Sequence, residues 1–287
     1  MHYTSIENIH KVIDPLFLDE LREELEEIKA VKVTKTKEAK LSEFRKKLGS
    51  LTFLDPACGS GNFLTETYIS LRRLENEALE EITQGQMLFD LGDVIHVNIS
   101  QFYGIEINDF AVTVATTALW ISEAQMLRET EKIIRRDIDF LPLKSYTNIV
   151  EGNALRVDWQ SVVPKEKLNF IIGNPPFVGL SLRNESQQED MANVFKGNDR
   201  AGRLDYVAAW YKKAANLIKG TNVECAFVST NSIVQGEQVP VLWEDLFMQG
   251  ITINFAHRSF IWSSEASQKA HVHCVIIGFA THNRTEK

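Results

Sequence analysis

Apolar and polar residues alternate along the chain in two rhythms, one typical of buried strands and one typical of helices. Short apolar runs predict seven strands, at residues 51–54, 102–106, 149–150, 170–172, 224–229, 251–256 and 271–279. Apolar positions three or four residues apart predict helices at residues 62–82, 109–127, 205–218 and 241–248. The long link at residues 257–270 favours an antiparallel pairing of the last two strands over a helical crossover.

Alternating strands and helices predict a doubly wound α/β fold: a mostly parallel, Rossmann-like sheet of seven strands with an antiparallel last strand and helices on both faces. Residues 1–48 are predicted to be an N-terminal helical segment, interrupted at Asp14-Pro15, and residues 49–287 the α/β domain. The helix at 109–127 is apolar enough to be packed on both sides. Residues 179–202 are polar and irregular, which predicts a long loop that is either functional or disordered.

Composition narrows the class of protein. The chain has 287 residues, of which 44% are hydrophobic, and a formal net charge of −8. Its 3 cysteines are far apart and show no C-x-x-C spacing, so neither a disulfide framework nor a zinc site is expected, and a reducing cytoplasm is the default location. No apolar stretch comes near the roughly 20 residues of a membrane span, and the first residues do not resemble a signal peptide.

The acidic net charge lacks the basic footprint that is usual in a stand-alone nucleic-acid-binding protein. Two interpretations remain open. The chain is an enzyme with small substrates, or it is a catalytic core whose phosphate-binding parts lie elsewhere. Composition does not choose between them.

The first candidate site is a glycine turn after the strand at 51–54, which reads Asp55-Pro56-Ala57-Cys58-Gly59-Ser60-Gly61. Glycines at such a turn let the backbone approach a ligand closely, as in the nucleotide sites of doubly wound folds. The turn is neither the G-x-G-x-x-G dinucleotide motif nor a phosphate loop. Glu106, at the end of the next strand, is placed to bind ribose hydroxyls, and Asp55 fits a cationic cofactor group. A strand-turn-helix connection without a ligand is the alternative.

The second candidate site, Asn174-Pro175-Pro176-Phe177, follows the strand at 170–172. Two consecutive prolines remove two N–H donors and keep the backbone out of the helical region. The Asn174 side-chain oxygen and the Pro175 carbonyl are then two fixed acceptors, which suit an –NH2 group. Phe177 can stack on a planar ring. A rigid turn without a ligand is the alternative, but ligands bind beyond the carboxyl ends of strands in such sheets, so both motifs should open into one crevice.

Together these residues resemble class I S-adenosylmethionine-dependent methyltransferases that modify exocyclic amino groups of DNA bases. Residues 55–61 resemble that family's cofactor motif, and residues 174–177 its catalytic motif for adenine N6. Residues 2–5 resemble an additional cofactor-contacting motif, and its place before the glycine turn is similar to the γ class, in which target recognition lies C-terminal. Residues 204–207 and 228–233 look like the methyltransferase part of MmeI-like type II restriction-modification enzymes.

The resemblance implies that residues 49–287 are the catalytic domain, that S-adenosylmethionine is the cofactor and that no metal takes part. The residues implied to contact the cofactor are Tyr3, Thr4, Asp55, Cys58, Gly59, Gly61, Glu106, Ile107 and Asn153. Those implied to hold the target base and to catalyse the transfer are Asn174, Pro175, Pro176 and Phe177. The glycine-turn residues would line the methionine end, Glu106 would hold the ribose and Ile107 would lie against the adenine ring. Asn153 stands where many relatives have Asp near the adenine amine.

The implied reaction is methylation of adenine N6 in double-stranded DNA, as the modification part of a restriction-modification system. The implied partners are DNA, a C-terminal target-recognition domain and a nuclease domain of the parent chain, and not a membrane. Methylation of RNA bases or of protein glutamine stays open, because both use Asn-Pro-Pro with an aromatic residue. A cofactor-binding subunit without catalysis also stays open, whereas a nicotinamide oxidoreductase would need the three-glycine motif that is missing here.

Overall fold

The computed structural model describes residues 4–83, 94–135, 148–262 and 272–284, apart from the side chains of residues 261, 262 and 272. Its α-helices are α1 (Ile6–Ile13), α2 (Asp19–Lys29), α3 (Thr34–Ser50), α4 (Asn62–Thr83), α5 (Asp109–Ile134), α6 (Trp159–Val162), α7 (Glu185–Val194), α8 (Ala208–Ile218) and α9 (Glu244–Met248). Its strands are β1 (Phe53–Asp55), β2 (Phe102–Glu106), β3 (Asn148–Glu151), β4 (Phe170–Gly173), β5 (Glu224–Thr230), β6 (Thr252–Trp262) and β7 (Val272–Ala280).

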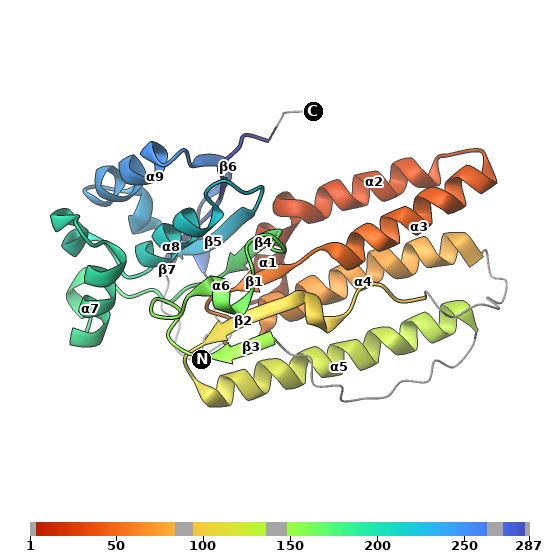
Figure 1. Cartoon of the computed structure of the whole chain (residues 1–287), viewed down its shortest axis with the longest axis horizontal. Helices are drawn as coiled ribbons and strands as arrows, with labels where there is room; N and C mark the ends of the chain where they lie inside the picture. Colours follow the sequence, from red (N-terminus) through yellow and green to blue (C-terminus); the bar gives the residue numbers. More distant parts are fainter. Residues whose placement is uncertain (1–3, 84–93, 136–147, 263–271, 285–287) are drawn as a thin grey trace.

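The strands form one seven-stranded sheet in the order β3-β2-β1-β4-β5-β7-β6 (Figure 1). The pairs β2–β3, β1–β2, β1–β4 and β4–β5 are parallel, whereas β7 is antiparallel to both β5 and β6. The strand order reverses between β1 and β4, which is the switch point where ligands bind in open α/β sheets. The predicted fold class is therefore confirmed, including its antiparallel end.

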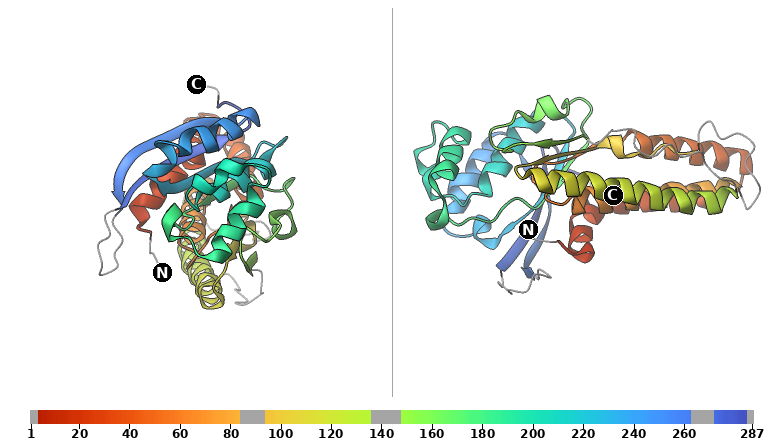
Figure 2. Two further views of the ribbon diagram at one scale, coloured as in Figure 1. Left: turned by 90° about the vertical axis from the view of Figure 1, so that its left-hand side faces the viewer. Right: turned by 90° about the horizontal axis from the view of Figure 1, so that it is seen from below.

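Helices cover both faces of the sheet. Successive residues of a strand point to opposite faces. Leu54 and Ile171 accordingly pack in a cluster with residues of α6 to α9, whereas their neighbours Phe53 and Ile172 pack with residues of α1 to α5. Figures 1 and 2 show that α2 to α5 run well beyond the sheet as a bundle of long helices, with α7 to α9 at the opposite end.

The N-terminal helices share their core with the sheet. The interruption predicted at Asp14-Pro15 is a π-helical turn, Asp14–Leu18, between α1 and α2. Phe17 of this turn packs on the rings of Phe53 and Phe170, with centroids 5.1 and 4.9 Å away. The division of the chain at residue 48 stays a prediction, and residues from both sides of it join one hydrophobic cluster.

Helix α5 is longer than predicted and is packed on one side only. Its buried residues recur every fourth position from Ala111 through Ala115 to Leu119, whereas Phe110 and Ile121 are 67% and 53% exposed. By length and composition alone α5 is also long and apolar enough to cross a membrane. The prediction that no apolar stretch of the sequence comes near the length of a membrane span was therefore wrong. The core helix of a soluble protein meets the same criterion, and Leu119 joins the cluster on the sheet.

The segment predicted to be an irregular loop, residues 179–202, is mostly ordered into short elements, so that prediction was wrong. It holds the 3-10 turns Leu180–Leu182 and Asp199–Arg203, the second of which runs one residue past it, with α7 between them. The start of α7 is a capping box, in which Asn184 and Gln187 each accept a hydrogen bond from the other's backbone N–H. Few apolar residues mark this helix, which is why hydrophobic periodicity missed it.

One predicted strand and one predicted helix are shorter than the observed elements. Strand β6 continues to Trp262, well past residue 256, through register shifts against β7 that are typical of β-bulges. The helix predicted at 241–248 begins as a π-helical turn, Val239–Trp243, with Pro240 at its start, and continues as α9.

A buried ion pair provides a test of the packing between α4 and its neighbours. Arg72 and Glu75 are 1% and 0% exposed and pair with each other, and Glu75 also accepts hydrogen bonds from the backbone of His96 and Val97. We expect Arg72→Ala to destabilise the fold by about 3–5 kcal/mol in urea denaturation, because it leaves a buried carboxylate without its cation. The exposed neighbour Arg73 is the matched control, and an equal loss in Arg73→Ala would contradict this account.

Candidate active site

A cavity of about 790 Å³ lies at the switch point, and both sequence motifs line it. The predicted site residues among its lining are Thr4, Asp55, Cys58, Gly59, Glu106, Ile107, Asn153, Asn174, Pro175, Pro176 and Phe177. Tyr3 lies outside the described residues. The expectation that the two motifs open into one crevice therefore matches the geometry.

Glu106 connects the glycine turn to the end of β2. Gly59 has a φ of +54°, a conformation that favours glycine, and its N–H donates to Glu106 Oε2 at 2.9 Å. The N–H of Asn108, the N-cap residue of α5, donates to the other oxygen, Oε1, at 3.0 Å. Each carboxylate oxygen keeps a free lone pair, so Glu106 can still accept from a ligand's hydroxyl groups while it holds the turn in place.

Gly61 lies between two residues that line the cavity, Ser60 and Asn62, and its contact with the methionine end of a cofactor stays a prediction. Its φ is +81°, and a Cβ there would lie 2.9 Å from the Cβ of Ala115 in α5. The lack of a side chain at Gly61 therefore allows both the turn and the close packing of α5.

Asp55 is a buried carboxylate at the centre of the site. Its Oδ1 accepts from the N–H of Ala57 at 3.0 Å. Burial raises the pKa of Asp55 to about 8; the Ala57 hydrogen bond opposes this shift and the charge of Glu106 adds to it. A Cβ at Gly173, the last residue of β4, would lie only 2.5 Å from Asp55 Oδ1. The absence of a side chain at Gly173 thus makes room for this carboxylate.

Asn174 begins the second motif, and its side-chain oxygen accepts no hydrogen bond from the described residues. Its Nδ2 donates to Thr4 Oγ1 at 3.4 Å. Its Oδ1 is buried and has no hydrogen-bond partner among the described residues. Since buried polar atoms are nearly always paired, such an atom at a cavity wall indicates a ligand with an N–H or O–H to donate.

Helix α7, helix α8 and the turn before α8 supply cavity residues that the sequence analysis missed, among them Asp190, Trp210 and Tyr206 respectively. Trp210 donates from Nε1 to the carbonyl of Pro56 at 3.1 Å, and its ring packs edge-on against Tyr206. Tyr206 and Trp210 are four residues apart, a spacing that indicates one helix face but does not distinguish a core from a site. Asp190 lay in the segment predicted to be a loop.

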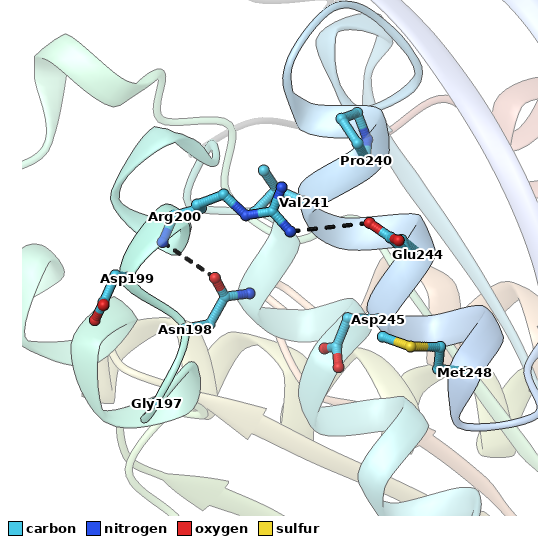
Figure 3. A pocket seen from close by; sticks show the side chains of 9 residues that line it. All are labelled: Gly197, Asn198, Asp199, Arg200, Pro240, Val241, Glu244, Asp245 and Met248. Atoms are coloured by element: carbon cyan, nitrogen blue, oxygen red, sulfur yellow. Dashed lines mark hydrogen bonds and ion pairs between the residues drawn. The ribbon is translucent and has the colours of Figure 1, made fainter.

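A second cavity, of about 490 Å³, lies between the 3-10 turn Asp199–Arg203 and α9 with its preceding π-helical turn (Figure 3). In it Arg200 pairs with Glu244 at 3.8 Å, and the N–H of Arg200 donates to Asn198. None of the predicted site residues line it, and we assign it no ligand.

Comparison with known proteins decides the family. Residues 31–287 match the family described as "MmeI, DNA-methyltransferase domain". The chain belongs to this family. The resemblance drawn from residues 55–61 and 174–177 is thereby confirmed.

Similar proteins are much longer than this chain. "DNA methyltransferase A" of Bacillus subtilis (strain 168) is 42% identical over 284 residues, which is 97% of this chain and 31% of that protein. The solved structure of the Type IIL restriction-modification enzyme MmeI in complex with DNA is 49% identical, with a TM-score of 0.93 over 100% of this chain and 38% of that one. The Type IIG restriction endonuclease BpuSI, 13% identical with a TM-score of 0.51, shares the fold alone. The chain spans about a third of the length of its two nearer relatives in this set.

The close approach of Gly173 to Asp55 can be tested by adding one methyl group. We expect Gly173→Ala to destabilise the fold by about 1–3 kcal/mol in urea denaturation, because its Cβ would overlap the Asp55 carboxylate. Gly179→Ala is the control, since a Cβ there would meet only Asp205 Oδ1, at an ordinary 3.9 Å, and should change stability by less than about 1 kcal/mol. Equal stabilities of the two variants would contradict the proposed overlap.

Proposed function

We propose that this chain transfers a methyl group from S-adenosylmethionine to the exocyclic N6 of adenine in double-stranded DNA, as the modification part of a restriction-modification system. The observation that carries the proposal is the unpaired, buried Asn174 Oδ1, in the same cavity as Glu106 and Asn153. One end of the cavity fits a nucleoside and the other fits an amine. Membership of the MmeI DNA-methyltransferase domain family supports the same reaction.

The cofactor end has the groups that S-adenosylmethionine requires. Glu106 has free lone pairs for the ribose hydroxyls, and the buried Asp55 offers a carboxylate to a cation. Ile107 and Asn153 line the part expected to hold the adenine ring. Bound there, the cofactor would supply a methyl group made electrophilic by its sulfonium.

The base end activates a weak nucleophile. The lone pair of an exocyclic amine is delocalised into its ring, so the nitrogen attacks poorly. Asn174 Oδ1 and the Pro175 carbonyl would accept the two N–H bonds, draw the nitrogen towards tetrahedral geometry and stabilise the positive charge that develops on it. Held in this way, the nitrogen would bond to the methyl carbon as the carbon–sulfur bond of the cofactor breaks, and would then lose one proton to water. Phe177 lines the same end and offers a ring for stacking.

The burial of Asn174 Oδ1 bears on the form of the substrate. A base stacked in a duplex cannot reach an acceptor inside a cavity, so we infer that the target adenine flips out of the helix. The chain is acidic, and we expect target recognition and DNA cleavage to depend on further domains of the longer protein type to which its relatives belong, acting in the cytoplasm. Those partners stay predictions.

The reaction is tested by the chemistry of its product. The chain is incubated with labelled S-adenosylmethionine and duplex DNA, RNA or protein, and the digests are analysed by mass spectrometry. We expect the label in N6-methyladenine of DNA. Label in RNA or in glutamine would replace the proposed substrate, and failure to bind the cofactor at all would overturn the methyltransferase assignment.

Removal of the unpaired acceptor should separate catalysis from cofactor binding. We expect Asn174→Ala to lower kcat by about 10²–10³-fold, the usual cost of removing one preorganised partner of a transition state. Its affinity for S-adenosylmethionine, measured by calorimetry, should change by less than about threefold. Asn198→Ala, at the second cavity, is the control and should keep wild-type turnover. Normal turnover in Asn174→Ala would falsify the mechanism.

Cofactor binding should depend on pH through Asp55. With a pKa of about 8 the free carboxyl is mostly protonated at pH 6 to 7.5, and a cationic cofactor binds the ionised form better. Affinity should therefore rise with pH across this window, by up to about tenfold per pH unit. Calorimetry on wild type and Asp55→Asn checks this, since the variant should bind weakly and without the pH dependence. The same pH slope in both proteins would assign the titration to another group.

A further inference from the structure

Helix α7 forms a wall of the main cavity beside Asn153. Asn184, Ser186, Gln187 and Asp190 all line the cavity. They lie on the N-terminal turns of α7, on positions three or four residues apart that share one helix face. The wall therefore presents polar side chains where a core helix would present apolar ones.

Asp190 is the best anchored of these side chains. It is 1% exposed. Its Oδ2 accepts from Asn153 Nδ2 at 2.9 Å and from the Tyr206 hydroxyl at 2.7 Å, and its Oδ1 accepts from Arg156 Nε at 2.6 Å. Burial by itself raises the pKa of Asp190, but the hydrogen bonds from Asn153, Tyr206 and Arg156 outweigh it and hold the pKa below its usual value. Asp190 is therefore an ionised group that only accepts hydrogen bonds at neutral pH.

The Asp190 carboxylate determines which end of the Asn153 amide is its nitrogen and which is its oxygen. An amide can be turned by 180° with little change in shape, so its partners decide which end is oxygen. On one side Asp190 accepts only. On the other side the N–H of Leu155 donates only, to Asn153 Oδ1 at 2.9 Å. The two together hold Asn153 with its nitrogen towards Asp190 and its oxygen towards Leu155.

So held, the Asn153 amide keeps one free lone pair and one free hydrogen. Adenine presents an amine that donates beside a ring nitrogen, N1, that accepts, which is the complementary pair. Hypoxanthine presents the reverse, a carbonyl oxygen beside an N–H. We propose that Asp190 is a positioning residue that fixes Asn153 in the orientation selective for the adenine ring of the cofactor. The inference rests on the proposed function, because it takes S-adenosylmethionine as the cofactor.

The substitution Asp190→Asn should remove this constraint on the orientation of the Asn153 amide. The Arg156 guanidinium only donates hydrogen bonds, so the new amide will turn its oxygen towards Arg156. The amide nitrogen then faces Asn153 Nδ2, which is a contact of two donors. Turning Asn153 over removes that contact but sets Asn153 Nδ2 against the Leu155 N–H, so neither orientation is favoured strongly and both become populated. Many relatives are expected to have Asp at position 153, whereas here the carboxylate comes from Asp190 on α7. Exchanging the two side chains, in Asp190→Asn/Asn153→Asp, therefore restores an acceptor next to the adenine amine.

The test measures selectivity between two ligands. Dissociation constants for S-adenosylhomocysteine and S-inosylhomocysteine, in which the amine is replaced by a carbonyl, are measured by calorimetry on the full chain. We expect the wild type to prefer the adenosyl ligand at least tenfold, Asp190→Asn to prefer it less than threefold, and the exchanged double variant to regain the tenfold preference. Glu189→Gln is the matched control on α7: it also pairs with Arg156 but does not touch Asn153, and it should keep the preference.

A purely structural role for Asp190 would weaken both ligands equally and leave their ratio unchanged. A folded Asp190→Asn chain that keeps more than a threefold preference therefore overturns the inference. If that variant does not fold, a double variant without the tenfold preference overturns it. A wild type that binds both ligands equally overturns the inference alone, whereas a wild type that binds neither overturns the proposed function.

Discussion

The contact between Gly173 and the buried Asp55 carboxylate joins the two halves of the active site. A side chain at Gly173 would occupy the space of Asp55 Oδ1, 2.5 Å from the position of a Cβ. Strands β1 and β4 are hydrogen-bonded neighbours up to this point, with Leu54 opposite Ile171. The glycine turn after β1 and Asn174 after β4 are therefore held at a fixed separation. A reaction between groups bound to the two loops depends on that separation, because alignment of the reacting atoms supplies much of the rate.

Polar groups around the cavity differ in how they are satisfied. Asp55 and Glu106 accept from backbone N–H groups, those of Ala57 and Gly59 in the glycine turn and that of Asn108 at the start of α5. Asp190 accepts from three side chains. Asn174 Oδ1 accepts from nothing in the part of the chain that is described. An unpaired buried acceptor costs roughly 1–3 kcal/mol. The carboxylates thus hold the site together whether or not a ligand is present, while the Asn174 oxygen is available only to a ligand.

The features predicted from sequence are those with a local cause. The glycine turn and the Asn-Pro-Pro-Phe motif could be placed because each follows an apolar strand, and the order of the sheet elements brings such loops to one edge. The packing role of Gly61 could not be predicted, since it depends on Ala115 in a helix far along the chain. The exposed face of α5 was misjudged because its apolar residues outnumber those that the sheet and α4 can cover. Both features depend on which surfaces pack together in the folded chain, and a local sequence pattern does not contain that information.

Helix α7 shows why a binding wall is harder to predict than a core. Hydrophobic periodicity detects a helix through the apolar stripe that it buries. The inward face of α7 instead carries Ser186, Gln187 and Asp190 along a cavity, so its periodicity is polar and resembles that of a loop. Its capping box, from Asn184 to Gln187, was the local signal that remained. Departures from the expected pattern concentrate at functional sites, and here the segment that lacked the pattern contributes Asp190, which accepts a hydrogen bond from Asn153.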